Sequence, residues 1–539
     1  MESLARDLRT MVRTPLADSH VEALRRIGEE RSYKAGHILL SAGDRMTHFL
    51  YVLEGRLEAL NAQGNRYGNA TLGPTQFVGE VNFLNDGVAL VPIRVVEDCR
   101  LLEVPRDAML RLMSQIPEMS DIIVTVYAAR RRGLLENQVS SLTLIGADRD
   151  RNIRQIAAFA SRNRIPFQSL ELDDAEAVET MEACSLTQHG PSVIFGDNTV
   201  IENPTPRAVA QLVGIDLDLD GDEVFDVLIV GGGPAGIAAA VYAGSEGLSA
   251  LVLEDLTVGG QAGTSSRIEN YMGFPTGISG ADLCWRGEVQ AMKFGTRFAM
   301  PRRATCLKPL DDELFCVELD DGSSVCARSV VIATGVQYRK LGLDRLEDFE
   351  GSGVYYAATD LEARYCRHTA AVIIGGGNSA GQAAMFLSRT ACHAHVLVRS
   401  NSLSKSMSSY LSGRLESDPA IHVHFQSEVC ALHGDTKLEA VTIRDRVDGR
   451  ERRIETNALF IMIGAAPNTD WLAKSIKLDP KGFVLTGSEV GGRSTYETSR
   501  RGIFAVGDVR AGSTKRVASA VGEGSVVISK VWEHVRSRS

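Results

Sequence analysis

The sequence has no C-x-x-C pair, although nine cysteines are spread over its 539 residues. Because that spacing brings two thiols together in redox-active dithiols, its absence argues against direct disulfide exchange. Basic residues are not in excess either, since 58 Lys and Arg stand against 68 Asp and Glu, a net charge of -10. A nucleic-acid-binding protein usually presents a basic face, so we expect no nucleic-acid partner.

We also expect neither a secretory signal nor a membrane span. Residues 1–10, MESLARDLRT, contain no apolar core, so we expect a cytoplasmic protein with reduced, mostly buried cysteines. Residues 227–244 carry no charge, but Gly231-Gly232-Gly233-Pro234 within them would break a helix in lipid. This stretch therefore predicts a buried strand, turn and helix, and we expect no membrane partner.

Short strand-like runs between His37 and Val104 predict a small β-barrel or jelly roll with flanking helices. With Phe77-Val78-Gly79-Glu80, the region resembles the cyclic-nucleotide-binding domain of catabolite-activator-type proteins. The resemblance implies that Gly79 and Glu80 contact a cyclic nucleotide or another anion. Leu90 occupies the place of the family's phosphate-binding Arg, and the nearest Arg is Arg94. A barrel used only for docking is therefore the alternative.

The segment 139–215 has the strand and helix order of the thioredoxin and glutaredoxin family, which it resembles. Gly190-Pro191 resembles that family's cis-proline, but the dithiol position reads Gly146-Ala147-Asp148-Arg149. We expect a redox-inactive adaptor. The acidic residues 216–224 predict a solvated linker, and Val227 at the twelfth position excludes an EF-hand, so no metal site is predicted.

A glycine-rich turn follows the apolar strand 225–230, opens a helix over 234–246, and is followed by strand 250–253. Such a turn lets the backbone approach a pyrophosphate, and the acid that ends the next strand can bind a ribose diol. We predict an FAD site. Its candidate residues are Gly231, Gly233, Pro234, Ala235, Gly236 and Glu254.

A second copy of this pattern begins with strand 372–374, and its next strand, 395–398, ends in a cation. A guanidinium pairs with a 2′-phosphate that a carboxylate would repel, so we predict NADPH, with NADH less favoured. The candidate residues are Gly375, Gly377, Asn378, Ser379, Ala380 and Arg399.

From Phe225 to its end, the chain resembles the low-molecular-weight thioredoxin reductases, through motifs such as Gly259-Gly260-Gln261 and Gly507-Asp508. The resemblance implies a homodimer and an FAD domain split into 225–338 and 467–539. An NADP domain, 339–466, would lie between the two parts and rotate to present nicotinamide to the flavin. It also implies further flavin-binding residues, namely Gly260, Gln261, Thr264, Asn270, Ala333, Thr334, Gly335, Gly507, Asp508, Arg516, Val517 and Ala518.

The family's two active cysteines are replaced by Ala357 and Asp360, and Cys366 remains alone. We therefore expect a flavoprotein that passes hydride from NADPH to FAD and on to a non-dithiol acceptor: a quinone, oxygen, a flavodoxin or a ferredoxin-type protein. Asp360 is either a proton donor near the flavin or a helix N-cap. The alternatives are a nucleotide- or redox-sensing regulatory flavoprotein and a disulfide reductase with displaced thiols.

These expectations combine into one multidomain fold. A β jelly roll spans 1–138, a thioredoxin-like α/β domain spans 139–215, and the linker spans 216–224. Two Rossmann-like, three-layer α/β domains complete the chain, one for FAD and one for NADP.

Overall fold

The computed structural model forms two compact units, Met1–Gly335 with Asn468–Ser539, and Val336–Pro467. It describes residues 14–61, 64–137, 140–147, 149–184, 191–196, 199–201, 204–217, 219, 221, 223–265, 268, 270–310, 314–350, 352–356, 358, 363, 366–404, 407–472 and 475–537. Within these ranges, no helix combines the length and the apolar character that crossing a membrane requires.

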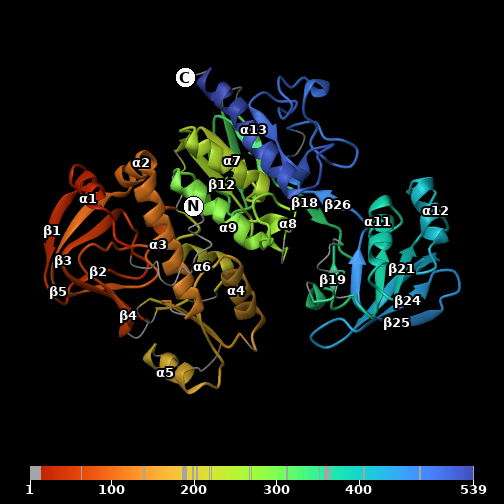
Figure 1. Cartoon of the computed structure of the whole chain (residues 1–539), viewed down its shortest axis with the longest axis horizontal. Helices are drawn as coiled ribbons and strands as arrows, with labels where there is room; N and C mark the ends of the chain where they lie inside the picture. Colours follow the sequence, from red (N-terminus) through yellow and green to blue (C-terminus); the bar gives the residue numbers. More distant parts are fainter. Residues whose placement is uncertain are drawn as a thin grey trace. The chain divides into compact units, whose positions relative to one another are not determined.

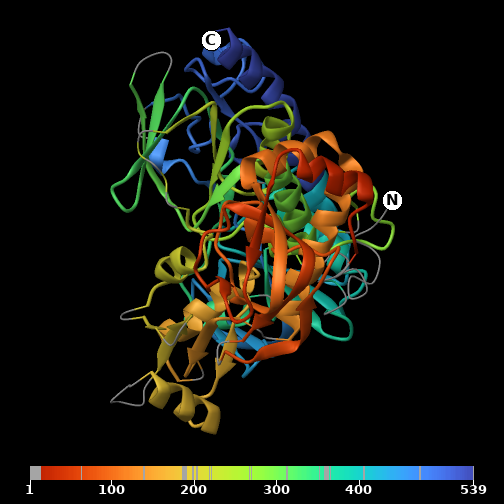
Figure 2. The same cartoon turned by 90° about the vertical axis from the view of Figure 1, so that its left-hand side faces the viewer.

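The N-terminal part of the first unit is a curled antiparallel sheet with flanking helices (Figures 1 and 2). Its elements are α1 (Asp18–Arg25), β1 (Glu29–Tyr33), β2 (Ile38–Leu40), β3 (His48–Leu60), β4 (Arg66–Leu72), η3 (Val81–Phe83), β5 (Ile93–Pro105), α2 (Arg106–Gln115) and α3 (Pro117–Glu136). The strand order is β1-β5-β3-β4, with β2 on β5. Tyr127 of α3 packs on Phe77 and Phe83 with ring centroids 5.9 and 6.0 Å apart, so α3 closes the core of the predicted β domain.

A smaller α/β segment follows. Its elements are β6 (Leu142–Ile145), α4 (Arg151–Arg162), β7 (Gln168–Leu170), α5 (Ala175–Ala183), β8 (Ser192–Phe195), β9 (Thr199–Val200) and α6 (Pro206–Leu212). The strand order is β7-β6-β8-β9, with β7 parallel to β6 and the other pairs antiparallel. Asp148 in the former dithiol position and Gly190 of the suggested cis-proline lie outside the described residues.

The prediction of a solvated linker is wrong at its first residue, because Asp216 is buried. Its carboxylate accepts from Nε of Arg207 at 3.1 Å and from Nε of Arg302. Arg302 also donates to Asp321 at 2.6 Å. Burial raises the pKa of Asp216, and the two guanidinium groups oppose that shift. This ion network ties the segment to the domain that follows, and sequence reasoning missed it because Arg302 lies 86 residues away.

The rest of the first unit is a parallel sheet of order β13-β12-β11-β17-β27 with helices on one face. On the other face lies a second sheet of order β10-β16-β15-β14, in which β16, β15 and β14 form an antiparallel meander and β10 runs parallel to β16. The strands are β10 (Val224–Phe225), β11 (Val227–Val230), β12 (Ala250–Leu253), β13 (Arg297–Ala299), β14 (Ala304–Pro309), β15 (Phe315–Leu319), β16 (Ser324–Ala327), β17 (Val330–Ile332) and β27 (Ile503–Ala505). The helices are α7 (Pro234–Ser245), α8 (Gly260–Gly263), α9 (Gly280–Lys293), η5 (Asp470–Leu472), η6 (Ser488–Val490), η7 (Gly507–Val509) and α13 (Val517–Arg536). The predicted strand 225–230 is in fact two, because Val224–Phe225 pairs with the meander.

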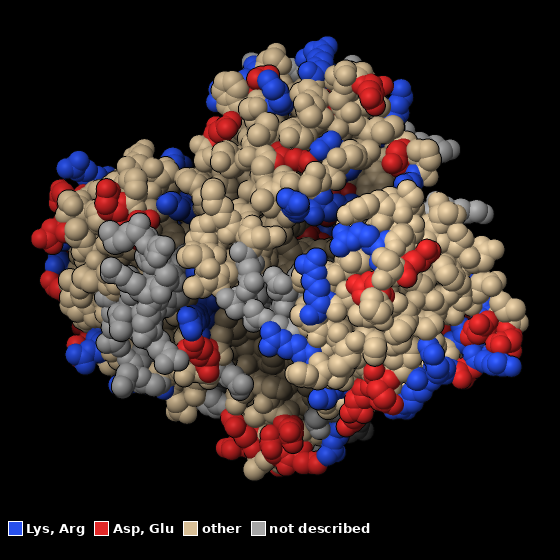
Figure 3. Space-filling view, turned by 45° about the vertical axis from the view of Figure 1, so that its right-hand side comes forward, with Lys and Arg blue, Asp and Glu red and all other residues tan. Residues whose placement is uncertain are grey.

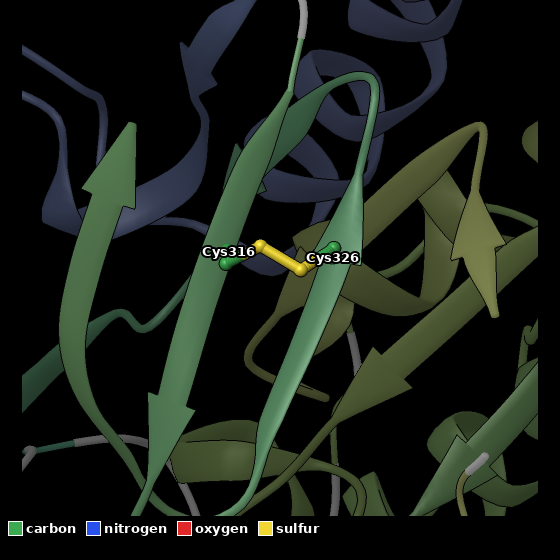
Figure 4. Close-up of a disulfide and its surroundings, with 2 residues drawn as sticks. All are labelled: Cys316 and Cys326. Carbon is green, nitrogen blue, oxygen red and sulfur yellow. A yellow bond between two sulfur atoms is a disulfide. The ribbon is translucent and has the colours of Figure 1, made fainter. Parts of the chain in front are cut away.

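The expectation that all thiols are reduced is wrong for one pair. Cys316 of β15 and Cys326 of β16 face each other across the meander and form a disulfide, with Cα atoms 4.1 Å apart (Figure 4). Their neighbours Phe315, Val317 and Val325 point into the core shared with the parallel sheet. Since side chains alternate along a strand, the disulfide lies on the opposite face of the meander. The other seven cysteines are not disulfide-bonded.

The second unit is a sheet of order β22-β21-β20-β25-β24-β23, with β19 on β25. Its elements are β18 (Val336–Tyr338), η4 (Glu347–Phe349), β19 (Val354–Tyr355), β20 (Ala370–Ile374), α11 (Asn378–Leu387), β21 (His393–Val398), α12 (Ser409–Ser417), β22 (Ile421–Phe425), β23 (Ser427–His433), β24 (Ala440–Asp445), β25 (Glu451–Ile461) and β26 (Ala465–Pro467). The unit starts three residues earlier and ends one later than the domain 339–466, because β18 pairs with β26 and both belong to it.

Charged side chains of both signs are interspersed over the face of the molecule that Figure 3 shows, with uncharged surface between them. The net charge of -10 therefore does not appear there as one continuous acidic field. Mixed charge of this kind is typical of a solvated surface.

Candidate functional sites

In the first glycine turn, Gly231 and Gly236 are packed too closely to carry a side chain, whereas Gly233 is not. A Cβ on Gly236 would lie 1.8 Å from the carbonyl oxygen of Gly231, and one on Gly231 would lie 2.4 Å from that of Ala333. A Cβ on Gly233, by contrast, would meet nothing within 4 Å. Gly233 is also the N-cap of α7 and has no side-chain cap. The N–H groups of the first helical turn, those of Ala235 and Gly236 behind Pro234, are thus available to a pyrophosphate.

Glu254 stands at the end of β12 and is 8 % exposed. Its carboxylate accepts from N–H of Gly232 at 2.7 Å and from N–H of Leu256 at 3.2 Å. Burial, followed by the charge of neighbouring Asp255, raises the pKa of Glu254 to about 8. Each oxygen keeps a further lone pair, so the buried acid can still accept hydrogen bonds from a ribose diol next to the turn.

The loop after β12 runs back over the glycine turn. N–H of Gly259 donates to the carbonyl of Gly232 at 2.7 Å, and a Cβ on Gly260 would lie 3.2 Å from Cα of Gly233. Beyond this contact, the side chains of Gln261, Thr264 and Asn270 are exposed. Gly259 and Gly260 are thus held against the proposed cofactor turn. The side chains of Gln261 and Asn270 are open to a ligand, and Oγ1 of Thr264 donates to the carbonyl of Gln261 at 2.9 Å.

The two parts of the split domain meet at a reciprocal pair of hydrogen bonds. Oγ1 of Thr334 donates to the carbonyl of Asn468 at 2.8 Å, and Nδ2 of Asn468 donates to the carbonyl of Thr334 at 2.9 Å. Ala333 is buried against the first turn, and Gly335 is the last residue before the second unit. The predicted Ala333-Thr334-Gly335 motif therefore has a structural role at the chain crossing, beside its proposed cofactor contact.

Asp508 lies in the short turn η7, directly after the last strand of the parallel sheet, and burial raises its pKa. Sequence reasoning missed the residue that holds this turn, Glu523 of α13. Its carboxylate is buried and accepts from N–H of Gly507 at 2.7 Å and from Nη2 of Arg510 at 2.6 Å. The sequence signal that could have revealed Glu523 is an acidic residue among the apolar residues of α13. The helix begins with Val517 and Ala518 after its N-cap, Arg516, which makes no side-chain cap.

The second turn, in the second unit, repeats the first. A Cβ on Gly375 would lie 2.4 Å from the carbonyl oxygen of Met462, so the turn packs on the strand end beside it. Gly377 is the N-cap of α11 without a side-chain cap, and Ala380 is buried where the first turn has Gly236. Ser379 is exposed on the first helical turn. Asn378 accepts from N–H of Ser408 at 2.8 Å, which ties the turn to the segment before α12.

Arg399 follows the last residue of β21 and is exposed. Among the described residues, it forms no ion pair. A solvated guanidinium at this strand end is free to bind the 2′-phosphate of a nucleotide placed on the turn.

The structure describes only part of the segment that would carry the family's dithiol. Ala357 and Asp360 lie outside the described residues, so neither suggested role of Asp360 is tested. Cys366 is fully buried in the core beside α11 and α12. A thiol in that position is shielded from a macromolecular substrate.

In the barrel, the proposed anion site is filled by the chain itself. Glu80 caps its own short helix, η3, by accepting from N–H of Asn82 at 3.1 Å, and it is paired with the buried Arg131, whose Nε lies 2.9 Å away. Leu90, at the missing arginine's position, is buried. Arg94 donates to Glu58 on the neighbouring strand at 2.8 Å and is thereby engaged elsewhere.

The turn directly after this short helix connects the barrel to the parallel sheet. Nδ2 of Asn85 donates to the carbonyl of Phe298 at 3.0 Å, and N–H of Phe298 donates to Oδ1 of Asn85 at 2.8 Å. Phe298 lies in the edge strand β13, whose next residue, Ala299, accepts from N–H of Glu254 at 3.2 Å. A buried side chain of the barrel thus contacts the strand that supports the proposed ribose-binding acid. The partners are 213 residues apart, which no sequence pattern reveals.

In a comparison with known proteins, two protein-family models match separate regions of the chain. The model of a family described as pyridine nucleotide-disulphide oxidoreductase matches residues 225–524, more than half of the chain. The model of the cyclic nucleotide-binding domain matches residues 30–116.

Among curated proteins, the chain is 35 % identical to a thioredoxin reductase of Treponema pallidum (strain Nichols) over 302 residues, 56 % of this chain and 94 % of that protein. It is 34 % identical to a thioredoxin reductase of Streptomyces clavuligerus over 303 residues, 56 % of this chain and 91 % of that protein. The structure of thioredoxin reductase from Streptococcus pyogenes MGAS5005 is 30 % identical and covers 58 % of this chain and 99 % of its own, with a TM-score of 0.51.

Proposed function

The chain belongs to the pyridine nucleotide-disulphide oxidoreductase family, and on that premise we propose that it oxidises NADPH with bound FAD and reduces an acceptor other than a dithiol. The observation that carries this proposal is the pair of glycine turns, one beside Glu254 and the other beside Arg399, in a chain without a C-x-x-C. FAD supplies the redox chemistry when bound, since it can accept a hydride and release two electrons.

The chain's own residues provide binding and orientation. The turn at Gly233 and the start of α7 would hold the FAD pyrophosphate, and Glu254 the ribose. In the second unit, the turn at Gly377 would hold the NADPH pyrophosphate, and Arg399 its 2′-phosphate. The homodimer stays a prediction that rests on resemblance, and the cytoplasmic location stays a prediction that rests on the composition of residues 1–10.

The acceptor proposed here is a quinone, oxygen, a flavodoxin or a ferredoxin-type protein. The disulfide Cys316–Cys326 is a poor candidate for a displaced catalytic pair, because it lies on the meander face turned away from the parallel sheet. Cys366, fully buried, is equally unsuited to exchange with a protein disulfide.

Steady-state NADPH oxidation with each acceptor class tests the proposal, with thioredoxin as the disulfide substrate. We expect turnover with at least one non-dithiol acceptor and none with thioredoxin. The variant Cys366→Ser should behave as the wild type. Reduction of thioredoxin that Cys366→Ser abolishes would establish the displaced-thiol mechanism instead. Asp360→Asn in the same assay decides whether Asp360 takes part in proton transfer or only caps a helix.

We also propose that the barrel and the adaptor-like segment dock on the flavin-binding part rather than sense a cyclic nucleotide. The pairing of Glu80 with Arg131 and the contact of Asn85 with Phe298 favour this role. The strand order β7-β6-β8-β9 supports a thioredoxin-like fold for the segment 139–215. Thermal melting of the full chain with cyclic AMP and cyclic GMP should show no saturable shift. A shift that Glu80→Gln removes would restore the sensing hypothesis.

A further inference from the structure

Four histidines gather on one face of the second unit's sheet, from two adjacent parallel strands. His393 and His395 lie in β21, and His422 and His424 lie in β22; we call these four the histidine cluster. The register places His395 opposite His422. The intervening Ala394 and Val396 pack into the core on the helix side, so the histidines point to the other face. The sequence signal is the repeated H-x-H, His393-Ala394-His395 and His422-Val423-His424.

We propose that the histidine cluster binds one divalent transition-metal ion of the Zn²⁺ class. Two nitrogens bound at 2.0–2.1 Å to a tetrahedral ion lie about 3.3–3.4 Å apart. In the structure, Nε2 of His422 and Nδ1 of His393 are 3.3 Å apart, and Nδ1 of His395 and Nε2 of His424 are 3.0 Å apart. The two cross-strand pairs therefore already have nearly the nitrogen spacing that one ion imposes.

The two pairs are also close to each other. The ring centroids of His395 and His422, which belong to different pairs, are 5.3 Å apart, and those of His393 and His395 are 6.3 Å apart. Within the described part of the chain, no three His, Cys, Asp or Glu side chains yet converge on one metal position. Binding therefore requires the rings to turn about their Cβ–Cγ bonds, a motion that the exposed His393 and His422 can make.

The chemistry of the donor set selects the ligand. Imidazole is a ligand for Zn²⁺, Ni²⁺ and Cu²⁺, whereas Mg²⁺ and Ca²⁺ prefer oxygen. Imidazole binds the transition-metal ions through a ring nitrogen in its neutral form. Arg452, 3.4 Å from Nε2 of His424, opposes a cation there and favours metal binding towards the His393 side.

A cavity of ≈ 500 Å³ adjoins the cluster at His393 and gives an ion access from solvent. Cys392, Glu439 and Glu455 also line it. The cluster is distinct from the nucleotide turn, because His393 begins β21 whereas Arg399 follows its C-terminal end. The strand separates these two positions by about 3.3 Å per residue.

Equilibrium dialysis of the chelator-treated full chain against ZnCl₂, with metal counted per chain, tests the proposal. We expect one tightly bound Zn²⁺ in the wild type and binding that is weaker by about 100-fold or more in His393→Gln/His422→Gln, which removes one ligand from each strand. Both residues are exposed, so this variant should keep its fold. His395→Gln/His424→Gln should also weaken binding, but by less, because Arg452 already opposes a cation beside His424.

His433→Gln is the matched control, because His433 lies in the same unit but bonds to Oγ1 of Thr442 at 2.7 Å, outside the cluster. It should bind as the wild type does, as should Cys392→Ser. A wild type that retains no Zn²⁺, or either double variant with unchanged affinity, contradicts the proposal. Zn²⁺ should also raise the melting temperature of the wild type and not that of the double variants. Equal shifts in all proteins would point to binding elsewhere.

Discussion

The two glycine turns have the same backbone plan but differ in the residue that ends the following strand. In the first, Glu254 is buried and accepts hydrogen bonds from its own turn. In the second, Arg399 is exposed and without an ion pair among the described residues. A repeated fold thus presents an acid to one nucleotide and a cation to the other. In the proposed function, the shared turn binds a dinucleotide in each unit, and the differing residue sets which dinucleotide each unit prefers.

The largest effect, on FAD binding, is expected when the first turn loses its close packing. Gly236→Ala would place a methyl group 1.8 Å from a backbone oxygen, so the turn must open. We expect overpacking of about 1–3 kcal/mol, which weakens FAD binding by about 10- to 100-fold. Flavin content after gel filtration and a fluorescence titration with FAD measure this loss. Gly522→Ala in α13, where a Cβ meets nothing within 4 Å, should retain the flavin. Equal flavin content in both variants would contradict the assigned role of the turn.

A smaller and more selective effect is expected at the second turn. Arg399→Ser removes a charge-assisted contact worth about 1.5–3 kcal/mol, so kcat/KM for NADPH should fall by about 10- to 100-fold. The value for NADH should hardly change, because NADH has no 2′-phosphate. Arg389→Ser, at the far end of α11, is the control and should leave both values unchanged. An equal loss with both nucleotides would show that Arg399 positions the turn rather than the phosphate.

A third effect concerns the pH dependence of the FAD-free protein. Because burial raises the pKa of Glu254 from 4.5 to about 8, the folded state holds this proton more tightly than the unfolded state does. The resulting stability is fully present below pH 4.5 and is lost as the pH rises through about 8. We expect melting temperatures that fall over this range and fall less in Glu254→Gln. Parallel pH profiles for the two proteins would show that Glu254 is not the group responsible.

The sequence predicted what is local or repeated along the chain. Each glycine turn, its helix and its terminal residue lie within a few tens of residues, and the fold requires that order. What it missed depends on contacts between distant segments, such as Asp216 with Arg302, Asn85 with Phe298, and Glu80 with Arg131. None of these pairs follows from periodicity, because each forms only after two domains or layers have packed. The disulfide is an intermediate case, since ten residues separate its cysteines across one hairpin.

Anaerobic stopped-flow mixing of the FAD-bound protein with NADPH, and separately with NADH, tests most directly whether the chain is an NADPH-oxidising flavoprotein. We expect rapid bleaching of the flavin absorption band by NADPH and slower bleaching by NADH at the same concentration. The difference should disappear in Arg399→Ser. No bleaching by either nucleotide would contradict the account, because the flavin would then receive no hydride from the second unit.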